Sequence, residues 1–100
     1  MTEMMDALVK AEDGPGLALQ RVPIPDPGPN EVLIAVTNTA ICGTDLHIYQ
    51  WDDWARSVVP VPMVVGHEFC GEVVAIGSAV SRYKPGQRVA VYPIAACGEC

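Results

Sequence analysis

Short apolar segments separated by turn-forming residues dominate the hydrophobic pattern of this 100-residue chain. Met4 to Lys10 and Leu17 to Val22 flank the cluster from Glu12 to Gly16, and together they predict an opening β-hairpin. Four prolines between Pro23 and Pro29 then predict an extended connector outside any β-ladder, because proline fixes φ and lacks an amide donor. The chain is therefore expected to begin with β-structure.

Two longer β-segments are predicted in the middle of the chain. Apolar and polar positions alternate from Glu31 to Thr37, as in a half-buried strand. The expected inward positions are Val32, Ile34 and Val36. A β-branched run from Met63 to Ile76 contains Gly66 and Gly71, and glycine within a strand marks a bulge or a close approach of two backbones. Cys70 lies within this run and is predicted to be a small buried thiol.

One short helix is predicted between these two segments. Residues 38–43 form a turn, after which Thr44 is a suitable N-cap for a helix from Asp45 to about Trp51. His47 follows Thr44 by three positions and is therefore expected on the same side of that helix.

The last part of the chain predicts one more turn and strand. Pro85 and Gly86 are suited to the centre of a type II turn, and Arg88 to Ile94 is the strand that follows. Several short strands with strong turn signals and at most one short helix favour an antiparallel β-barrel or sandwich, built as a single domain.

Composition and charge narrow the class of protein. Half of the residues are apolar and 18% are charged, which is typical of a globular chain. The net charge of -6 and six scattered basic residues argue against nucleic acid as a partner. We find no signal-peptide pattern and no apolar stretch long enough for a membrane span, so a soluble cytoplasmic protein is expected.

The residues that could carry chemistry are potential metal ligands. Four cysteines without a secretory signal indicate metal ligands or buried thiols rather than disulfides. Thiolate, imidazole and carboxylate are donors that zinc accepts, and here they are Cys42, His67 and Glu68. Cys97 and Cys100 have the two-residue gap of a structural zinc knuckle. Spacing alone leaves open a buried core histidine and a solvent-facing strand carboxylate.

Several motifs in one order resemble a known family. Gly66-His67-Glu68-x-x-Gly71, followed by Gly77 and Val80, resembles the signature of the zinc-containing alcohol dehydrogenases of the medium-chain dehydrogenase/reductase superfamily. The blocks Cys42-Gly43-Thr44-Asp45 and Pro85-Gly86-Gln87-Arg88-Val89 are similar to the same family at the same spacing. The resemblance implies that residues 1–100 are the N-terminal part of a mainly β, GroES-like β-barrel catalytic domain, without the family's NAD-binding Rossmann domain.

The resemblance also implies two zinc sites. Cys42, His67 and Glu68 match the catalytic zinc positions, with any remaining protein ligand beyond residue 100, and Glu68 either binds the metal or lies just behind it. Cys97 and Cys100 match the first two of the four cysteines that hold a structural zinc. Two thiolates cannot close a tetrahedral site, so within these 100 residues that lobe is expected to be disordered or metal-free.

Catalytic roles for two helix residues follow from the same resemblance. Thr44 would hydrogen-bond the reacting oxygen, and His47 would pass the proton on to solvent, as suits a side chain that titrates near neutral pH. Without the resemblance, Thr44 is equally an ordinary helix cap and His47 an exposed polar residue.

Trp51-Asp52-x-Trp54 sharpens the resemblance to the branch of the family that oxidises the 3-hydroxyl of L-threonine. It implies a zinc- and NAD-dependent full-length enzyme, a homotetramer with a small-molecule substrate, whereas residues 1–100 alone are expected to be inactive. Two alternatives remain open at this point: a polyol or diol dehydrogenase of the same family, and a non-catalytic GroES-like zinc-binding module.

Overall fold

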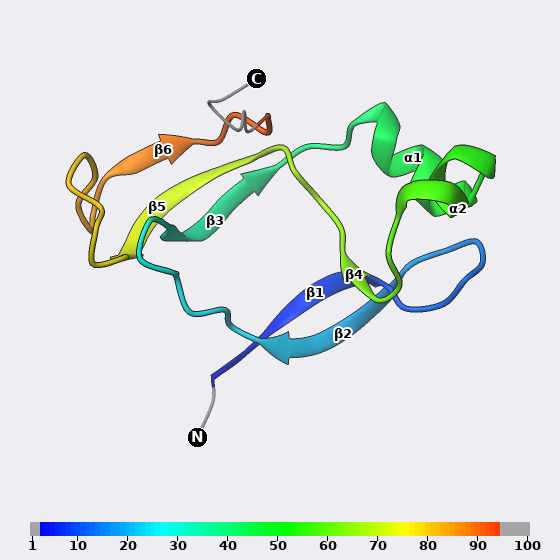
Figure 1. Ribbon diagram of the computed structural model, residues 1–100, viewed down its shortest axis with the longest axis horizontal. Coiled ribbons are helices and arrows are strands. Elements are labelled where there is room, and N and C mark those ends of the chain that lie inside the picture. Colours follow the sequence, from blue (N-terminus) through cyan, green and yellow to red (C-terminus); the bar gives the residue numbers. More distant parts are fainter. Residues whose placement is uncertain (1–2, 95–100) are drawn as a thin grey trace. The chain divides into compact units, whose positions relative to one another are not determined.

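The computed structural model describes residues 3–94, which form six strands and two short helices (Figure 1). They are, in chain order, β1 (Met4–Lys10), β2 (Ala18–Pro23), β3 (Val32–Thr39), α1 (Gly43–Gln50), α2 (Asp53–Val58), β4 (Met63–Val64), β5 (Phe69–Ile76) and β6 (Arg88–Ala90). All strand pairs among these residues are antiparallel, so the predicted mainly β class is confirmed. No helix within residues 3–94 is long and apolar enough to cross a membrane.

The chain divides into two compact units, and neither unit is a continuous segment. One unit consists of Met1–Pro25 and Ile41–Gly66, and the other of Asp26–Ala40 and His67–Cys100. Each unit contains one three-stranded sheet, with strand order β2-β1-β4 in the first and β3-β5-β6 in the second.

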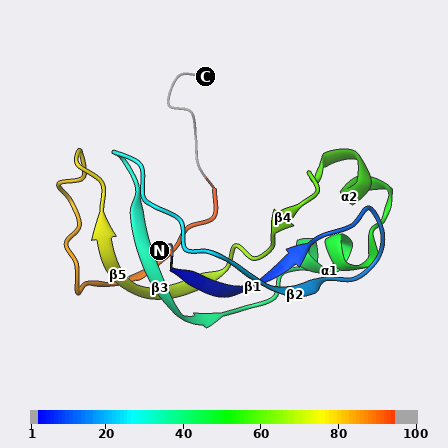
Figure 2. The same cartoon turned by 90° about the horizontal axis from the view of Figure 1, so that it is seen from below.

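The first unit contains the predicted hairpin. β1 and β2 pair from Met4 opposite Pro23 to Val9 opposite Ala18, and β4 adds to the other edge of β1 (Figure 2). In β1, Ala7 and Val9 are buried while Leu8 between them is exposed, and Lys10 at the end of the strand is buried as well. The expected hairpin is confirmed, with its second strand one residue displaced.

The helices of the first unit differ from the prediction in two respects. Cys42, not Thr44, is the N-cap of α1, because the Asp45 carboxylate turns back and accepts a hydrogen bond from the Cys42 amide at 3.0 Å. Thr44 therefore lies inside the first turn. A second helix, α2, was not expected; it begins after Asp52, whose carboxylate accepts a hydrogen bond from the Ala55 amide at 2.9 Å.

A small apolar cluster holds these helices. Ile48, Trp51 and Ala55 are its buried members. The half-buried side chains packed against it are Leu17, Val59, Met63 and Val65. The cluster thus joins both helices to the hairpin loop and to the segment around β4.

Trp51 ends α1 in the left-handed conformation, with φ 60° and ψ 51°. A bulky residue rarely adopts this backbone, at a cost of roughly 1–3 kcal/mol, so the surroundings must hold it. Its ring is buried, its indole N–H donates to Asp13 Oδ1 at 2.6 Å, and the Lys10 ammonium lies 4.7 Å from the ring centroid. These contacts compensate for the backbone strain.

Lys10 itself is fully buried beneath the hairpin loop. Its ammonium donates to the carbonyl oxygens of Gly14 at 2.8 Å and Gly16 at 2.6 Å. Burial lowers the pKa of Lys10 from its ordinary value, because desolvation disfavours the charged form. The Gly16 amide donates to the Tyr49 carbonyl at 2.7 Å, so the loop is fixed to the last turn of α1.

Replacing Lys10 with methionine is expected to lower the free energy of unfolding by about 1–3 kcal/mol, since two loop carbonyls lose a charged donor while the apolar stem is kept. Urea unfolding followed by tryptophan fluorescence measures the change. Lys84→Met is the matched control, because Lys84 is exposed on the turn before β6. Equal stability of the two variants would contradict a structural role for the buried ammonium.

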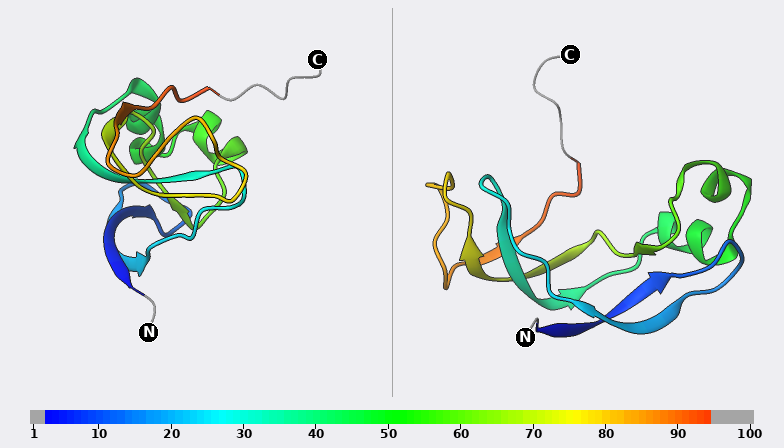
Figure 3. Two further views of the ribbon diagram at one scale, coloured as in Figure 1. Left: turned by 90° about the vertical axis from the view of Figure 1, so that its left-hand side faces the viewer. Right: turned by 60° about the horizontal axis from the view of Figure 1, so that its bottom comes forward.

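The second unit is a sheet with β5 at its centre (Figure 3). β3 follows the predicted strand but its inside–outside alternation is wrong at Val36, which is 55% exposed. The pairing of β3 with β5 is also irregular, with register shifts between Leu33 and Ile34 and between Val36 and Asn38.

Two other strand predictions in this part of the chain require correction. The run from Met63 to Ile76 is not one strand: β4 and β5 belong to different sheets. Gly66, with φ 120°, lies in the break between them. β6 ends at Ala90, short of the predicted Ile94. Ala90 pairs with Cys70, the second residue of β5, so β5 offers little further length for pairing. The Val91 amide still donates to the carbonyl of Phe69, the first residue of β5.

The remaining turn and glycine predictions are confirmed. The Gln87 amide donates to the Lys84 carbonyl at 3.2 Å and Gly86 has φ 96°, as a type II turn requires. Gly71 lies where β3 and β5 approach closely: a Cβ built there would be 2.1 Å from the Ala35 carbonyl oxygen. Only glycine fits at this position.

Candidate metal and proton-transfer site

Cys42 lies at the junction between a strand and a helix. It follows the end of β3 by three residues and is the N-cap of α1, with its side chain half-buried. The thiol donates to Thr44 Oγ1 at 3.8 Å, within the first turn. The amide groups and positive end of a helix N-terminus favour negative charge, and the thiolate is the form of cysteine that binds metals.

His67 and Glu68 lie in the segment between β4 and β5, so the prediction that His67 is on a strand is wrong. Both side chains are half-buried. Backbone contacts to the end of β3 fix this segment: the Glu68 carbonyl accepts from the Ala40 amide at 2.8 Å and from Thr39 Oγ1 at 3.0 Å. Glu68 is therefore held directly beside the last residues of β3.

The course of the chain limits how far Cys42 can be from this segment. Cys42 follows Ala40 by two residues, and two trans peptide units span at most about 8 Å between Cα atoms. The Ala40 amide itself donates to the Glu68 carbonyl, so the covalent link from Ala40 to Cys42 sets this limit. Each of Cys42, His67 and Glu68 offers one ligand atom of a type that zinc accepts.

Thr44 and His47 occupy successive turns of α1, as expected for residues three positions apart. Thr44 is half-buried, whereas the His47 side chain is 56% exposed. The His47 ring is in edge-to-face contact with Trp54, with 6.1 Å between ring centroids and 67° between planes. Trp54, from the motif singled out in the sequence, thus contacts His47, the predicted proton carrier.

Asp52 is a residue of this region that the sequence analysis did not single out. Its Oδ2 lies 2.5 Å from His47 Nδ1. The pKa of Asp52 is lowered from its ordinary value, first by the hydrogen bond from the Ala55 amide and further by the hydrogen bond and charge of His47, although partial desolvation opposes the shift. A separation of five residues is not a helical neighbour spacing, and the left-handed turn at Trp51 creates the contact.

The other predicted thiols fall into two groups. Cys97 and Cys100 lie outside the described residues. Cys70 is the second residue of β5 and is half-buried, with its sulfur 3.9 Å from Thr37 Oγ1. It behaves as the packing thiol that was expected, although it is less deeply buried.

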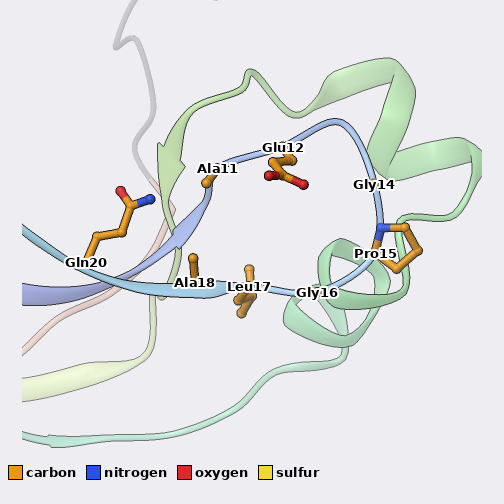
Figure 4. A pocket seen from close by; sticks show the side chains of 8 residues that line it. All are labelled: Ala11, Glu12, Gly14, Pro15, Gly16, Leu17, Ala18 and Gln20. Carbon is orange, nitrogen blue, oxygen red and sulfur yellow. The ribbon is translucent and has the colours of Figure 1, made fainter.

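A hollow of about 270 Å³ lies inside the hairpin loop of the first unit (Figure 4). Its lining residues are Ala11, Glu12, Gly14, Pro15, Gly16, Leu17, Ala18 and Gln20. None of them is a predicted site residue, and Glu12 alone among them is ionisable, so the hollow offers no set of metal or catalytic groups.

Comparison with known protein families identifies the family to which this chain belongs. Residues 28–100 match the sequence profile described as the alcohol dehydrogenase GroES-like domain. The chain therefore belongs to the alcohol dehydrogenase GroES-like domain family, and the fold expected from the motifs is confirmed.

Relatives by sequence include L-threonine 3-dehydrogenases. The enzyme of that name from Chelativorans sp. (strain BNC1) is 60% identical over all 100 residues, and the one from Rhizobium rhizogenes is 56% identical. The chain spans 29% of the length of these curated relatives.

Solved structures of related enzymes have the same fold. A putative zinc-binding dehydrogenase from Sinorhizobium meliloti 1021, bound to NADP, has a TM-score of 0.82 and 39% identity over 98% of this chain and 27% of its own. Benzyl alcohol dehydrogenase from Acinetobacter calcoaceticus has the same TM-score of 0.82 with 35% identity, over 98% of this chain and 26% of its own.

Proposed function

We propose that these residues are the N-terminal catalytic portion of a zinc- and NAD-dependent L-threonine 3-dehydrogenase, which converts L-threonine and NAD to 2-amino-3-oxobutanoate and NADH. The observation that carries the proposal is the pair of hydrogen bonds from Thr39 and Ala40, three and two residues before Cys42, that hold the Glu68 carbonyl. The substrate is supported by relatives of that name at 55–60% identity along the whole chain.

The donor set fits a catalytic zinc. Cys42, His67 and Glu68 would hold the metal together with any ligand from beyond residue 100, and Glu68 would bind it or lie just behind it. Bound zinc acts as a Lewis acid that lowers the pKa of an alcohol and leaves one position open for it. Cys97 and Cys100 would contribute to a second, structural zinc.

The helix supplies the route for the proton. Thr44 Oγ1, beside the Cys42 sulfur, would hydrogen-bond the reacting hydroxyl of the substrate and orient it. His47, one turn further along α1 and largely exposed, would take up the proton and release it to solvent. The carbon that bears the reacting hydroxyl would lose a hydride to bound NAD, and its oxygen would lose the proton.

The same proposal covers the localisation, oligomeric state and partners of the full-length protein. It would be a cytoplasmic homotetramer that binds a small-molecule substrate and has no nucleic-acid or membrane partner. The net charge of -6 supports the exclusion of nucleic acid.

Assaying the full-length protein with NAD and L-threonine, sorbitol or 2,3-butanediol tests the substrate. We expect NADH formation with L-threonine, with kcat/KM at least tenfold above that for the other two. Faster turnover of sorbitol or 2,3-butanediol would replace threonine by a polyol or diol. Residues 1–100 alone are expected to bind zinc without turnover, and NADH production by this segment would contradict the account.

A further inference from the structure

The Asp52 carboxylate makes two contacts with different atoms. Oδ2 meets His47 Nδ1 at 2.5 Å, and Oδ1 accepts the Ala55 amide at 2.9 Å as the N-cap of α2. Because α2 fixes one oxygen, the other is held in a defined position beside the imidazole. The ring is confined on a further side by the edge-to-face contact with Trp54.

An ionised carboxylate can only accept hydrogen bonds. The nitrogen of His47 that faces it must then carry a proton, which leaves Nε2 as the lone-pair nitrogen of the neutral ring. We propose that Asp52 is a positioning residue that holds His47 as the Nδ1-protonated tautomer, so that Nε2 is the atom that takes up the proton. This inference rests on the proposed role of His47 as the proton carrier.

The other charged groups near this turn are engaged elsewhere. Arg56 Nε donates to the Trp51 carbonyl at 3.4 Å, and its Nη2 lies 4.0 Å from Asp53 Oδ1. Asp13 accepts the Trp51 indole N–H, and Asp45 accepts the Cys42 amide. Within the described residues, Asp52 supplies the carboxylate that contacts the His47 ring. It stays ionised at neutral pH, because its pKa is lowered by the Ala55 amide and by His47.

Two substitutions separate the positioning role from the helix cap. Asp52→Ser keeps a favourable N-cap for α2 but is too short to reach the imidazole. Asp52→Asn also caps the helix and can still accept from Nδ1, but it lacks the charge. Asp53→Asn is the matched control, since it removes the neighbouring charge from a fully exposed side chain that makes no contact with His47.

The primary measurement is the ¹⁵N shift of the His47 ring nitrogens in the full-length protein, assigned with His47→Gln. We expect the Nδ1-protonated tautomer in the unsubstituted protein and in Asp53→Asn, and mixed tautomers in Asp52→Ser. The second measurement is kcat/KM. Asp52→Ser is expected to lose about ten- to hundredfold in kcat/KM, because the His47 ring is no longer held in the tautomer whose Nε2 takes up the proton.

Each outcome decides the inference. An unchanged tautomer in Asp52→Ser, or an equal loss in Asp53→Asn, overturns it. If Asp52→Ser does not fold, Asp52→Asn takes its place. That variant is expected to keep the tautomer of His47 and to have a reduced kcat/KM. Full activity of Asp52→Asn would overturn the role of the charge. The ring shifts require no turnover, so failure to oxidise threonine would remove the proposed function without deciding the tautomer.

Discussion

The Cys42→Ser protein is expected to lose its catalytic zinc and to retain less than about one hundredth of its activity. Removing a residue that only hydrogen-bonds to a metal ligand lowers metal affinity or activity by roughly 10–100-fold, so removing a ligand itself should lower them further. Serine is a preferred helix N-cap, which preserves the start of α1 and restricts the change to the metal. Metal analysis of the full-length protein should show one zinc per chain instead of two.

Cys70→Ser is the control for this experiment. It makes the same chemical change at the other thiol in the described part of the chain, on β5 beside Thr37, where no metal is expected. This variant should keep both zinc ions and activity within about twofold. Two zinc ions per chain in Cys42→Ser would exclude Cys42 as a ligand, whatever happens to the rate.

Replacing Gly71 with alanine is expected to destabilise the fold by at least about 2–3 kcal/mol, a large part of the stability of a typical domain. The new methyl group would lie 2.1 Å from the Ala35 carbonyl oxygen and 2.9 Å from Ile34 Cγ2. A backbone atom cannot move aside as a flexible side chain can, so β3 and β5 must separate. The midpoint of thermal or urea unfolding, with the yield of folded protein, measures the effect.

Gly14→Ala provides the comparison for this steric effect. A Cβ at Gly14 meets nothing within 4 Å, and the substitution adds the same methyl group to the hairpin loop. Its stability should change by no more than about 0.5 kcal/mol. If the two variants unfold at the same urea concentration, the close approach of β3 and β5 is not what requires glycine.

The sequence predicts those parts of the fold that depend on local signals. The hairpin of β1 and β2 follows from a turn cluster and two flanking apolar runs, and the Pro85-Gly86 turn follows from backbone preferences. By contrast, the register shifts between β3 and β5 and the early end of β6 depend on the partner strand, which determines the residues that pair. No local pattern carries that information.

The candidate site is predictable to a similar extent. The donor chemistry of Cys42, His67 and Glu68 is visible in the sequence, as is the proximity of Thr44 and His47 on one helix. Asp52 was missed because its contact with His47 requires a left-handed backbone at Trp51, and tryptophan gives no signal for that conformation. The contacts that support Trp51 come from Lys10 at the end of β1 and from Asp13 in the hairpin loop, which is 38 positions before Trp51.

The pairing of β3 with β5 has a consequence for synthesis on the ribosome. β1 and β2 can close their hairpin as soon as residue 23 has emerged, but β3 ends at Thr39 and its partner is complete only at Ile76. At typical translation rates of about 5–20 residues per second, β3 waits roughly two to seven seconds with both edges unpaired. During that interval, helix formation by residues 43–58 can proceed, so Cys42 can become the N-cap of α1 before His67 and Glu68 are synthesised.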